Sequence, residues 1–410
     1  MHKRLLIILI SSLIIMGLPG FSECGSPSLS LNEENSVILD KDEEKEGNAG
    51  EKRDVPESAK VSSELVFEKE MQREYAEKFR VFYYEGGYTL LEISETEERF
   101  LLVPEDGKIP SDLSEDVKVI KRPVKNIYLV ASAVMDMFAS LDGVDSIKFS
   151  GKKEEDWYIP DAVSAMKEGN LIYAGKYSKP DYEMIVSGEC SVIIENTMIY
   201  HSPEVKEQFE SFKIPVIVEY SNYEDHPLGR VEWIKFFGAL LGQEEMADKV
   251  FYEQKAIVDS VADNEKTNKT VAYFYITSNN LIQVRKSSDH ISKMIEIAGG
   301  EYIFKNLEDD DSKRTTVNMQ IEEFYNEAKD ADILIYNSSI DGGVNSLPEL
   351  YAKCEHIKDF KAAKEGNVWC TTNDSYQQSL SAGYMIEDLN NILNGEYDNL
   401  HYLFRLEENQ

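Results

Sequence analysis

The sequence has few of the residues from which thiol and imidazole sites are built. Its 410 residues include 4 cysteines and 6 histidines, and no two cysteines form a Cys-x-x-Cys pair. A small secreted domain held by disulfides needs a far denser set of cysteines, and a structural zinc site needs several closely spaced Cys or His ligands. The sequence therefore excludes a disulfide framework and does not indicate a structural zinc site.

Positive charge is also scarce. Lys and Arg number 43 against 76 Asp and Glu, which gives a formal net charge of −33. Such a charge repels phosphate backbones and anionic lipid headgroups, so nucleic-acid binding through a basic surface is excluded. The hydrophobic fraction of 42% is too high for a wholly disordered chain. We therefore expect a large, folded, acidic protein with room for two or three domains.

The motifs of common catalytic sites are missing as well. The sequence lacks the Gly-x-Gly-x-x-Gly and Gly-Lys-Ser/Thr phosphate loops and the Gly-x-Ser-x-Gly turn of hydrolases. The histidines are scattered, and His201 and His290 are both expected in loops that follow strands, one in each half of the chain. We predict that the protein is not an enzyme and holds no resident metal. A cleft site for zinc or manganese that uses His201 and His290 remains an alternative.

The N-terminus has the features of a secretory leader. Lys3 and Arg4 precede an apolar run over residues 5–16. The run is short for a membrane span, which needs about 20 residues. Cys24, followed by Gly and Ser, resembles the lipid-acceptor cysteine of bacterial lipoproteins, although Glu23 stands where a small residue is usual. We predict a leader over residues 1–24 that ends in lipidation at Cys24, with an uncleaved anchor as the alternative.

Residues 25–70 are predicted to be a disordered acidic tether. Between residues 32 and 60 the sequence is dominated by Glu, Asp, Lys, Ser and Gly and shows little apolar periodicity. Such a composition cannot bury enough apolar surface to offset the entropy lost on ordering. The folded part is therefore expected to begin near residue 71.

After the tether, strand and helix patterns alternate. Two strand-like runs at residues 79–84 and 88–93 flank Glu-Gly-Gly and predict a hairpin, which a third short strand at 99–103 follows. Further strands are predicted in the first half at residues 126–130, 146–149, 192–195 and 216–219, and in the second half at residues 271–276, 281–284, 333–336 and 368–370. Helical periodicity over residues 133–141 and 288–298 separates some of them. This alternation indicates an α/β fold with mostly parallel sheets.

The segment over residues 227–263 shows helical periodicity alone. Apolar residues line one face up to Gly242, a predicted helix end, and a second helix of about 30 Å continues to about Ala262. We therefore predict two Rossmann-like α/β lobes with mostly parallel sheets, joined by a long bridging α-helix. The N-terminal lobe is placed at residues 71–226, the bridge at 227–263 and the C-terminal lobe at 264–410.

The order of these segments resembles a known family. The similarity runs from residue 123 to the C-terminus and rests on PVKNIYLV, KPDYEMIVSGECSVIIEN, FKIPVIVEY, HISKMIEIAGGEYIF and NMQIEEFYNEAKDADILIYN. These segments resemble the ABC-transporter substrate-binding proteins of the iron-siderophore, haem and cobalamin class. The resemblance implies an extracytoplasmic, monomeric protein without a cofactor that captures a metal chelate between its lobes and delivers it to a membrane permease. A tethered enzyme or sensor on the same fold is the alternative.

In this family an exposed carboxylate on each lobe docks onto arginines of the permease. The resemblance places these acids at Glu204, with Glu207 nearby, and at Glu323, with Glu322 beside it. Acids at helix starts also complement the helix dipole, which is the simpler alternative.

The ligand is expected where strands end and helices begin, because parallel sheets open a crevice at their carboxyl ends. This rule nominates six loops, at residues 131–136, 157–158, 195–201, 223–230, 285–286 and 374–378. A flat chelate needs aromatic walls and one or two cations. The predicted ligand-binding residues are Trp157, Tyr158, Met198, Tyr223, Arg230, Arg285 and Tyr376. Core packing of the aromatic residues and solvation of the cations are the alternatives.

Three cysteines lie in the predicted lobes. Cys190 and Cys370 are expected to be buried thiols at strand positions. A disulfide between Cys354 and Cys370 is an alternative that the sequence leaves open.

Overall fold

The computed structural model describes residues 55–307, 315–338 and 343–408, which belong to one compact unit. The predicted leader, Cys24 and the tether up to residue 54 lie outside the described residues. Within the described ranges, no helix is both long and apolar enough to cross a membrane.

An N-terminal sheet precedes the two lobes. Its order is β1-β2-β3-β4-β5, in which only the β4–β5 pairing is parallel. Its bounds are β1 (Phe67–Glu70), β2 (Phe79–Tyr84), β3 (Tyr88–Ile93), β4 (Glu98–Val103) and β5 (Val117–Lys121). The predicted hairpin is confirmed, with Tyr84 opposite Tyr88 across the turn. Gly86 and Gly87 in this turn have φ of 78° and 81°, a conformation that glycine adopts without strain.

The prediction that the tether extends to residue 70 is wrong. Strand β1 pairs with β2, and Ala59 and Val61 are buried beside Phe82 and Leu90 in a small second core. A few apolar residues in an otherwise charged segment are enough here, because they pack against a sheet that the rest of the chain supplies. The prediction from charge-rich composition therefore placed the start of the folded region too late in the chain.

The first lobe is built on a parallel sheet of order β12-β11-β6-β7-β8. Its strands are β6 (Ile127–Leu129), β7 (Ile147–Ser150), β8 (Ile172–Tyr173), β11 (Ile193–Asn196) and β12 (Val216–Glu219). The short pair β9 (Gly175–Lys176) and β10 (Lys179–Pro180) lies outside this sheet. The helices of the lobe are α1 (Ser132–Ser140), α2 (Pro160–Glu168), α3 (Tyr182–Ser187) and α4 (Pro203–Ser211). The predicted strands in this half are confirmed to within a residue or two.

The second lobe contains a mixed sheet of order β16-β14-β13-β17-β18-β19, with β15 paired to β13. The strands are β13 (Thr270–Ile276), β14 (Ile282–Arg285), β15 (Glu301–Tyr302), β16 (Thr316–Met319), β17 (Ile333–Tyr336), β18 (Val368–Thr371) and β19 (Leu403–Arg405). The helices are α7 (His290–Ile297), α8 (Ile321–Ala328), α9 (Leu347–Lys353), α10 (Lys361–Glu365) and α11 (Ala382–Asn394). Strands β14, β16 and β19 pair antiparallel, so "mostly parallel" holds for the first lobe but not for the second.

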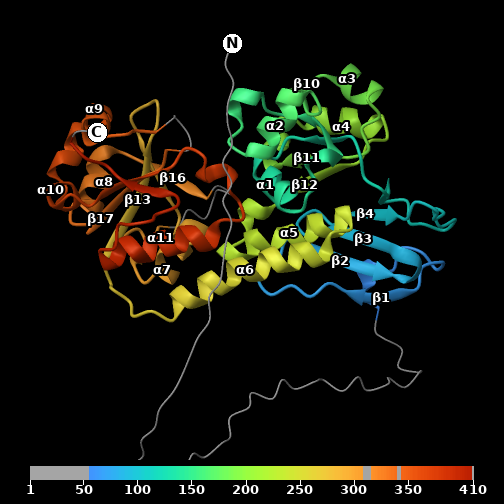
Figure 1. The fold of residues 1–410 in the computed structure, drawn as a ribbon, viewed down its shortest axis with the longest axis horizontal. Helices are drawn as coiled ribbons and strands as arrows, with labels where there is room; N and C mark the ends of the chain where they lie inside the picture. Colours follow the sequence, from blue (N-terminus) through green and yellow to red (C-terminus); the bar gives the residue numbers. More distant parts are fainter. Residues whose placement is uncertain (1–54, 308–314, 339–342, 409–410) are drawn as a thin grey trace, which may run out of the picture. The chain divides into compact units, whose positions relative to one another are not determined.

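Two consecutive helices form the predicted bridge. Helix α5 (Pro227–Leu241) ends at Gly242, whose φ of 75° gives a left-handed cap, and α6 (Glu244–Ala262) follows. Helix α5 packs against α6 and strand β2, and α6 continues to α11 and α7 of the second lobe. Figure 1 shows both helices between the blue N-terminal sheet and the red C-terminal helix α11. The bridge therefore consists of two helices with only a short break at residues 242–243 between them.

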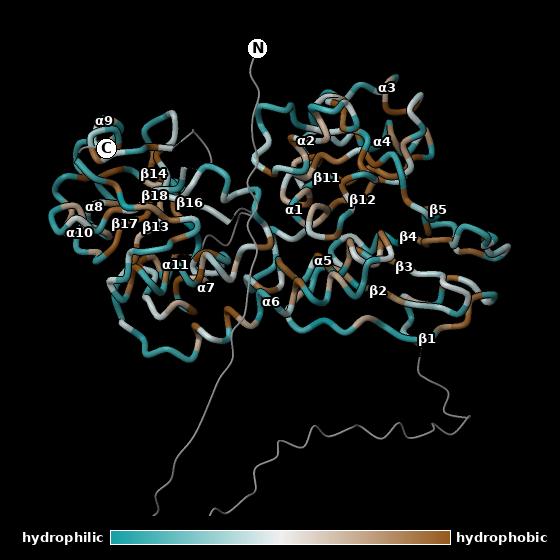
Figure 2. Tube along the Cα trace, viewed as in Figure 1, coloured by the Kyte–Doolittle hydropathy of each residue, from teal (hydrophilic) through white to brown (hydrophobic). Residues whose placement is uncertain are grey.

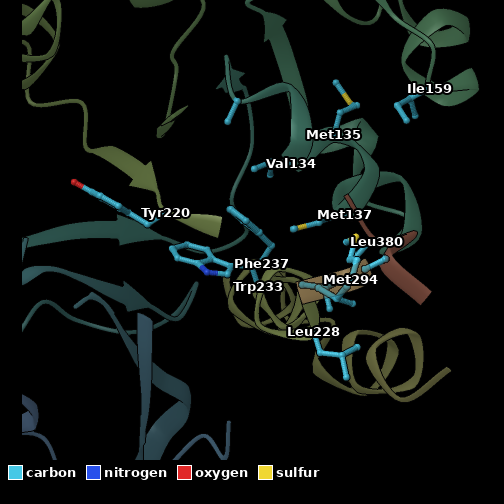
Figure 3. Packing of buried hydrophobic residues seen from close by; sticks show 14 of the residues in the cluster. Val134, Met135, Met137, Ile159, Tyr220, Leu228, Trp233, Phe237, Met294 and Leu380 are labelled. Atoms are coloured by element: carbon cyan, nitrogen blue, oxygen red, sulfur yellow. The ribbon is translucent and has the colours of Figure 1, made fainter. Parts of the chain in front are cut away.

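The apolar strands and α5 form one core that reaches both lobes. Figure 2 shows the hydrophobic segments concentrated in the strands and bridging helices. In Figure 3, Met294 and Leu380 of the second lobe lie with Met137 of α1, and all three are buried in the same cluster as Phe237 of α5. The two sheets are consequently held by shared packing as well as by α6.

The carboxylates of two buried glutamates, Glu224 and Glu232, hold the segment before β2 against the bridge by hydrogen bonds. The carboxylate of Glu232 accepts hydrogen bonds from the backbone N–H groups of Glu74, Tyr75 and Ala76 at 2.8–3.1 Å. The Glu224 carboxylate, which precedes α5, accepts the next two N–H groups of the chain and the indole N–H of Trp233, each at 2.9 Å. The segment over residues 74–78 is thus bound to the bridge by backbone donors that would otherwise lack partners.

Candidate ligand-binding site

A cavity of about 290 Å³ opens at the carboxyl ends of the central strands. Asn196 ends β11, Glu219 ends β12, and Asn337 directly follows β17, and all three line the cavity. Ser132 and Ala133 at the start of α1 complete the side formed by the first lobe. The cavity lies where the crevice rule for parallel sheets places a ligand.

The bridge and the second lobe supply the remaining wall. Arg230 comes from α5, Tyr273 and Arg285 come from β13 and β14, and His290 comes from α7. Asn222 of the first lobe also lines the cavity, and the other residues on the side of the second lobe are Ile291, Met294, Ser375, Tyr376, Gln378, Ser379, Ser381, Ala382 and Met385. Hydroxyl and amide side chains therefore outnumber aromatic ones around the cavity.

Arg230 connects both lobes. Its guanidinium donates to Asn222 Oδ1 at 2.7 Å on the first lobe and contacts His290 Nε2 on the second. The sequence places this cation in the first turn of a helix, which is unfavourable for the helix dipole. Burial lowers the pKa of Arg230, and Asp289 and Glu219 lie close enough to counteract part of this effect.

A charged chain continues from His290 to Arg285. Asp289 Oδ2 lies 3.5 Å from both His290 Nδ1 and Arg285 Nη1. Burial alone would raise the pKa of Asp289, but His290 and Arg285 outweigh it and hold that pKa well below its usual range. Burial, together with Arg230, lowers the pKa of His290 to about 4. His290 is therefore neutral at pH 7, with Nε2 accepting from Arg230 and its proton on Nδ1 facing Asp289.

The acids on the first-lobe side are poorly solvated. Glu219 accepts hydrogen bonds from Ser221 N–H at 2.8 Å and from the Ser221 hydroxyl, yet burial still raises its pKa. Glu195, one residue before the cavity-lining Asn196, is 1% exposed, and burial raises its pKa well above the usual value. Both acids favour the neutral form more than an ordinary glutamate does, whereas the arginines keep their charge.

A segment of the second lobe docks directly onto the first lobe beside the cavity. We call residues 375–381 the latch; it includes the 3₁₀ turn Ser375–Gln377. Gln377 is fully buried, its Oε1 accepts from Tyr158 N–H at 2.9 Å, and its Nε2 donates to the Asp156 carbonyl at 2.8 Å. The rings of Tyr158 and Tyr376 meet edge to face at 6.2 Å.

Further contacts fix the end of the latch to α1. The Ser379 hydroxyl donates to the Ala133 carbonyl at 2.6 Å, and Leu380 N–H donates to Asp136 Oδ2 at 2.9 Å. Burial raises the pKa of Asp136 to about 6 despite the Leu380 hydrogen bond. The lobes are therefore hydrogen-bonded to each other on one side of the cavity.

The raised pKa of Asp136 predicts a pH-dependent stability. Between the unfolded value of 3.8 and about 6, the folded protein binds more protons at Asp136 than the unfolded chain, so this group makes the protein less stable as pH rises through that window. Asp136→Asn keeps an oxygen acceptor for Leu380 and removes the charge. We expect the variant to gain stability over wild type between pH 4 and pH 7, by at most about 3 kcal/mol at 1.36 kcal/mol per pKa unit. Urea unfolding at several pH values measures this gain, and a pH-independent difference would contradict it.

The predicted ligand-binding residues fall into two groups. Arg230, Arg285 and Tyr376 line the cavity together. Tyr158, Met198 and Tyr223 do not line it; Tyr158 belongs to the contact with the latch, and Met198 is 45% exposed.

The structure corrects the prediction that Trp157 binds the ligand. Trp157 is 5% exposed within the apolar core of the first lobe, and its indole N–H donates to the Ser150 hydroxyl at 3.0 Å. The aromatic pair Trp157-Tyr158 was expected to form a cavity wall, but Trp157 anchors its loop to the core and does not line the cavity.

Sequence reasoning missed several residues of the cavity. Asn337 could have been found, because it follows a predicted strand as the nominated loops do. Tyr273 and Met294 lie inside a strand and a helix that show no local sign of facing a cavity. Their role depends on how the second lobe faces the first, which no short pattern encodes.

The other predicted residues lie away from the cavity. Glu204 and Glu323 are exposed in the first turns of α4 and α8. His201 is exposed and does not line the cavity with His290, and the described residues contain no group of three or more His, Cys, Asp or Glu side chains suited to a metal ion. Cys354 and Cys370 are thiols, so they do not form the alternative disulfide, and Cys190 is a buried thiol.

Comparison with known proteins gives relatives and structural neighbours. No protein-family model matches the chain. An uncharacterized lipoprotein of Methanocaldococcus jannaschii is 27% identical over 370 residues, which cover 83% of this chain and 87% of the relative. A second uncharacterized lipoprotein of the same organism is 27% identical over 352 residues, covering 81% and 86%.

Among solved structures, a periplasmic heme binding protein of Vibrio cholerae matches with a TM-score of 0.53 at 15% identity, over 65% of this chain and 98% of that protein. An ABC-type Fe3+-hydroxamate transport protein of Saccharomonospora viridis matches with a TM-score of 0.52 at 16% identity, over 67% and 94%. The fold is therefore that of these two-lobed binding proteins. The chain is longer than these neighbours, which cover about two thirds of it.

Proposed function

We propose that this protein is the extracytoplasmic substrate-binding component of an ABC importer, which captures a metal chelate between its lobes and delivers it to a membrane permease. The observation that carries the proposal is the cavity of about 290 Å³ between two α/β lobes, with Arg230, Arg285 and Tyr376 in its wall. The binding-protein fold and the solved neighbours named for heme and Fe3+-hydroxamate support it. The lipoprotein relatives support an extracytoplasmic location and lipidation at Cys24.

The proposed action follows from the fold. A ligand that enters the crevice meets groups from both lobes, and the continuous helix α6 restricts the lobes to small relative movements, because bending a helix costs more than turning a loop. The protein itself carries out no chemistry in this proposal. It acts as a monomer that presents the loaded form to the permease.

Ligand binding is tested by a thermal-shift panel with ferric citrate, a ferric hydroxamate, haemin and cyanocobalamin on the purified soluble chain. A compound present at about 100 times its dissociation constant adds about 2.7 kcal/mol of stability, which gives a clear rise in melting temperature. We expect at least one compound of the panel to do so. If no compound shifts the melting temperature and native mass spectrometry of the protein from its own host finds no bound molecule, the proposal fails.

Permease docking is tested by reversing charges on the exposed acids. We expect Glu204→Lys and Glu323→Lys, alone and together, to abolish uptake of the bound compound by cells and to leave its affinity unchanged, because both carboxylates lie away from the cavity. Glu168→Lys, at an exposed site at the end of α2, makes the same charge change as a control. Loss of affinity in the docking variants, or equal loss of uptake in the control, would contradict this assignment.

A further inference from the structure

We infer that the ligand is a compact, oxygen-rich anion of the polycarboxylate-chelate type, bound between Arg230 and Arg285, and not a tetrapyrrole such as haem or cobalamin. The inference rests on the proposed function and narrows its substrate class. Three observations lead to it: the size of the cavity, the chemistry of its wall and the way in which the lobes are fastened.

Size comes first. A cavity of about 290 Å³ is at the lower end of the range of ligand pockets. A tetrapyrrole is among the largest small-molecule ligands and fills a pocket nearer the upper end of that range. Such a ligand would need the lobes to move apart.

Moving the lobes apart is opposed by the latch. Gln377 would lose its hydrogen bonds to the Tyr158 N–H and the Asp156 carbonyl, and it would leave a fully buried position. Asp136 would lose Leu380, and Arg230 would lose either Asn222 or His290. These contacts favour a cleft that stays close to its present width.

The wall also favours an anion over a flat apolar ring. Tyr273 and Tyr376 are the aromatic side chains in it, and Trp157, the expected stacking surface, lies in the core. Hydroxyl and amide groups supply hydrogen-bond partners for oxygen atoms, and both arginines present planar donors suited to carboxylates. In a protein with a net charge of −33, two arginines held at one cavity give a local site for an anion.

The acids near the arginines reduce this attraction only in part. Asp289 is engaged by His290 and Arg285 and does not line the cavity. Glu219 does line it, but its carboxylate is hydrogen-bonded by Ser221, and burial favours its neutral form. Among the described residues, Arg230 Nε is buried without a hydrogen-bond partner, whereas the other two nitrogens of this guanidinium are held by Asn222 and His290.

The test measures binding by calorimetry with ferric citrate, citrate alone, inorganic phosphate, haemin and cyanocobalamin. We expect ferric citrate or citrate to bind and the two tetrapyrroles not to bind. Tighter binding of ferric citrate than of citrate supports the inference, whereas the reverse assigns the free acid as the ligand and overturns the assignment of a metal chelate. Binding of haemin or cyanocobalamin in preference to the anions overturns the inference and leaves the proposed function standing. No binding by any of the five overturns the inference, and the proposed function then fails only if the ferric hydroxamate and native mass spectrometry are negative as well.

Substitutions of the two arginines test where the anion binds. Arg230→Met and Arg285→Met should each weaken binding of the best anion about thirtyfold or more and reduce its dependence on salt. Arg230→Lys, which keeps the charge but loses the planar fork, should recover part of the affinity. Arg405→Met is the matched control, because Arg405 bonds to the Gly366 carbonyl outside the cavity. Equal affinity in wild type and both cavity variants would overturn the assignment, and the melting temperature of each ligand-free variant shows whether it is folded.

Discussion

Glu232→Ala is expected to destabilise the protein by about 3–5 kcal/mol, the cost typical of breaking a buried ionic group from its partners. Glu232 is fully buried, accepts the N–H groups of Glu74, Tyr75 and Ala76, and lies 3.1 Å from Lys235 Nζ. Alanine would leave three backbone donors and a 3%-exposed lysine without this partner. Urea unfolding followed by circular dichroism measures the loss.

Two further variants make this result interpretable. Glu232→Gln keeps an oxygen acceptor and should lose less stability than the alanine variant. Glu245→Ala removes an exposed glutamate from the first turn of the next helix and should change stability by less than about 1 kcal/mol. If Glu232→Ala loses less than about 1 kcal/mol of stability, the hydrogen bonds of Glu232 do not hold the segment over residues 74–78 to the bridge.

Gln377→Ala should accelerate release of the bound compound by about 30- to 100-fold. The side chain makes two hydrogen bonds to the first lobe, and their loss leaves Tyr158 N–H and the Asp156 carbonyl to be solvated by water. At about 1 kcal/mol net for each bond, plus the lost packing of a fully buried side chain, opening becomes easier by about 2–3 kcal/mol. Stopped-flow displacement of the bound compound by an excess of competitor gives the dissociation rate.

The control for the latch is Gln208→Ala, the same substitution at an exposed site on α4. Its dissociation rate should equal that of wild type. An unchanged rate in Gln377→Ala, with the melting temperature of the ligand-free protein also unchanged, would contradict a role for the latch in retaining the ligand.

Local patterns predicted the elements of this fold well. The hairpin at residues 79–93, strands β12 and β17 and the left-handed cap at Gly242 follow from apolar alternation, buried apolar runs and glycine, which act over a few residues. The missed elements depend on distant partners. Strand β19 is short and forms against β18, and β1 lies in a charged segment that only the neighbouring β2 organises.

The location of the cavity could be predicted from the sequence, but the side chains that line it could not. The rule for parallel strands nominated the loops that contribute Ser132, Asn196, Arg230 and Tyr376. It could not distinguish Trp157, which is buried, from Tyr158 beside it, because an aromatic residue in a loop has the same local pattern whether it faces core or solvent. The contact between the latch and α1 joins residues far apart in sequence, so no local sequence pattern could have predicted it.

The central claim, that the crevice between the lobes binds the transported compound, is tested most directly by hydrogen–deuterium exchange. The protein is compared with and without the panel compound that raises its melting temperature most. We predict slower exchange in peptides that contain Asn196, Asn222, Asn337 and the latch, because all of them lie at or beside the cavity. Protection confined to other surfaces, with these peptides unchanged, would contradict the account.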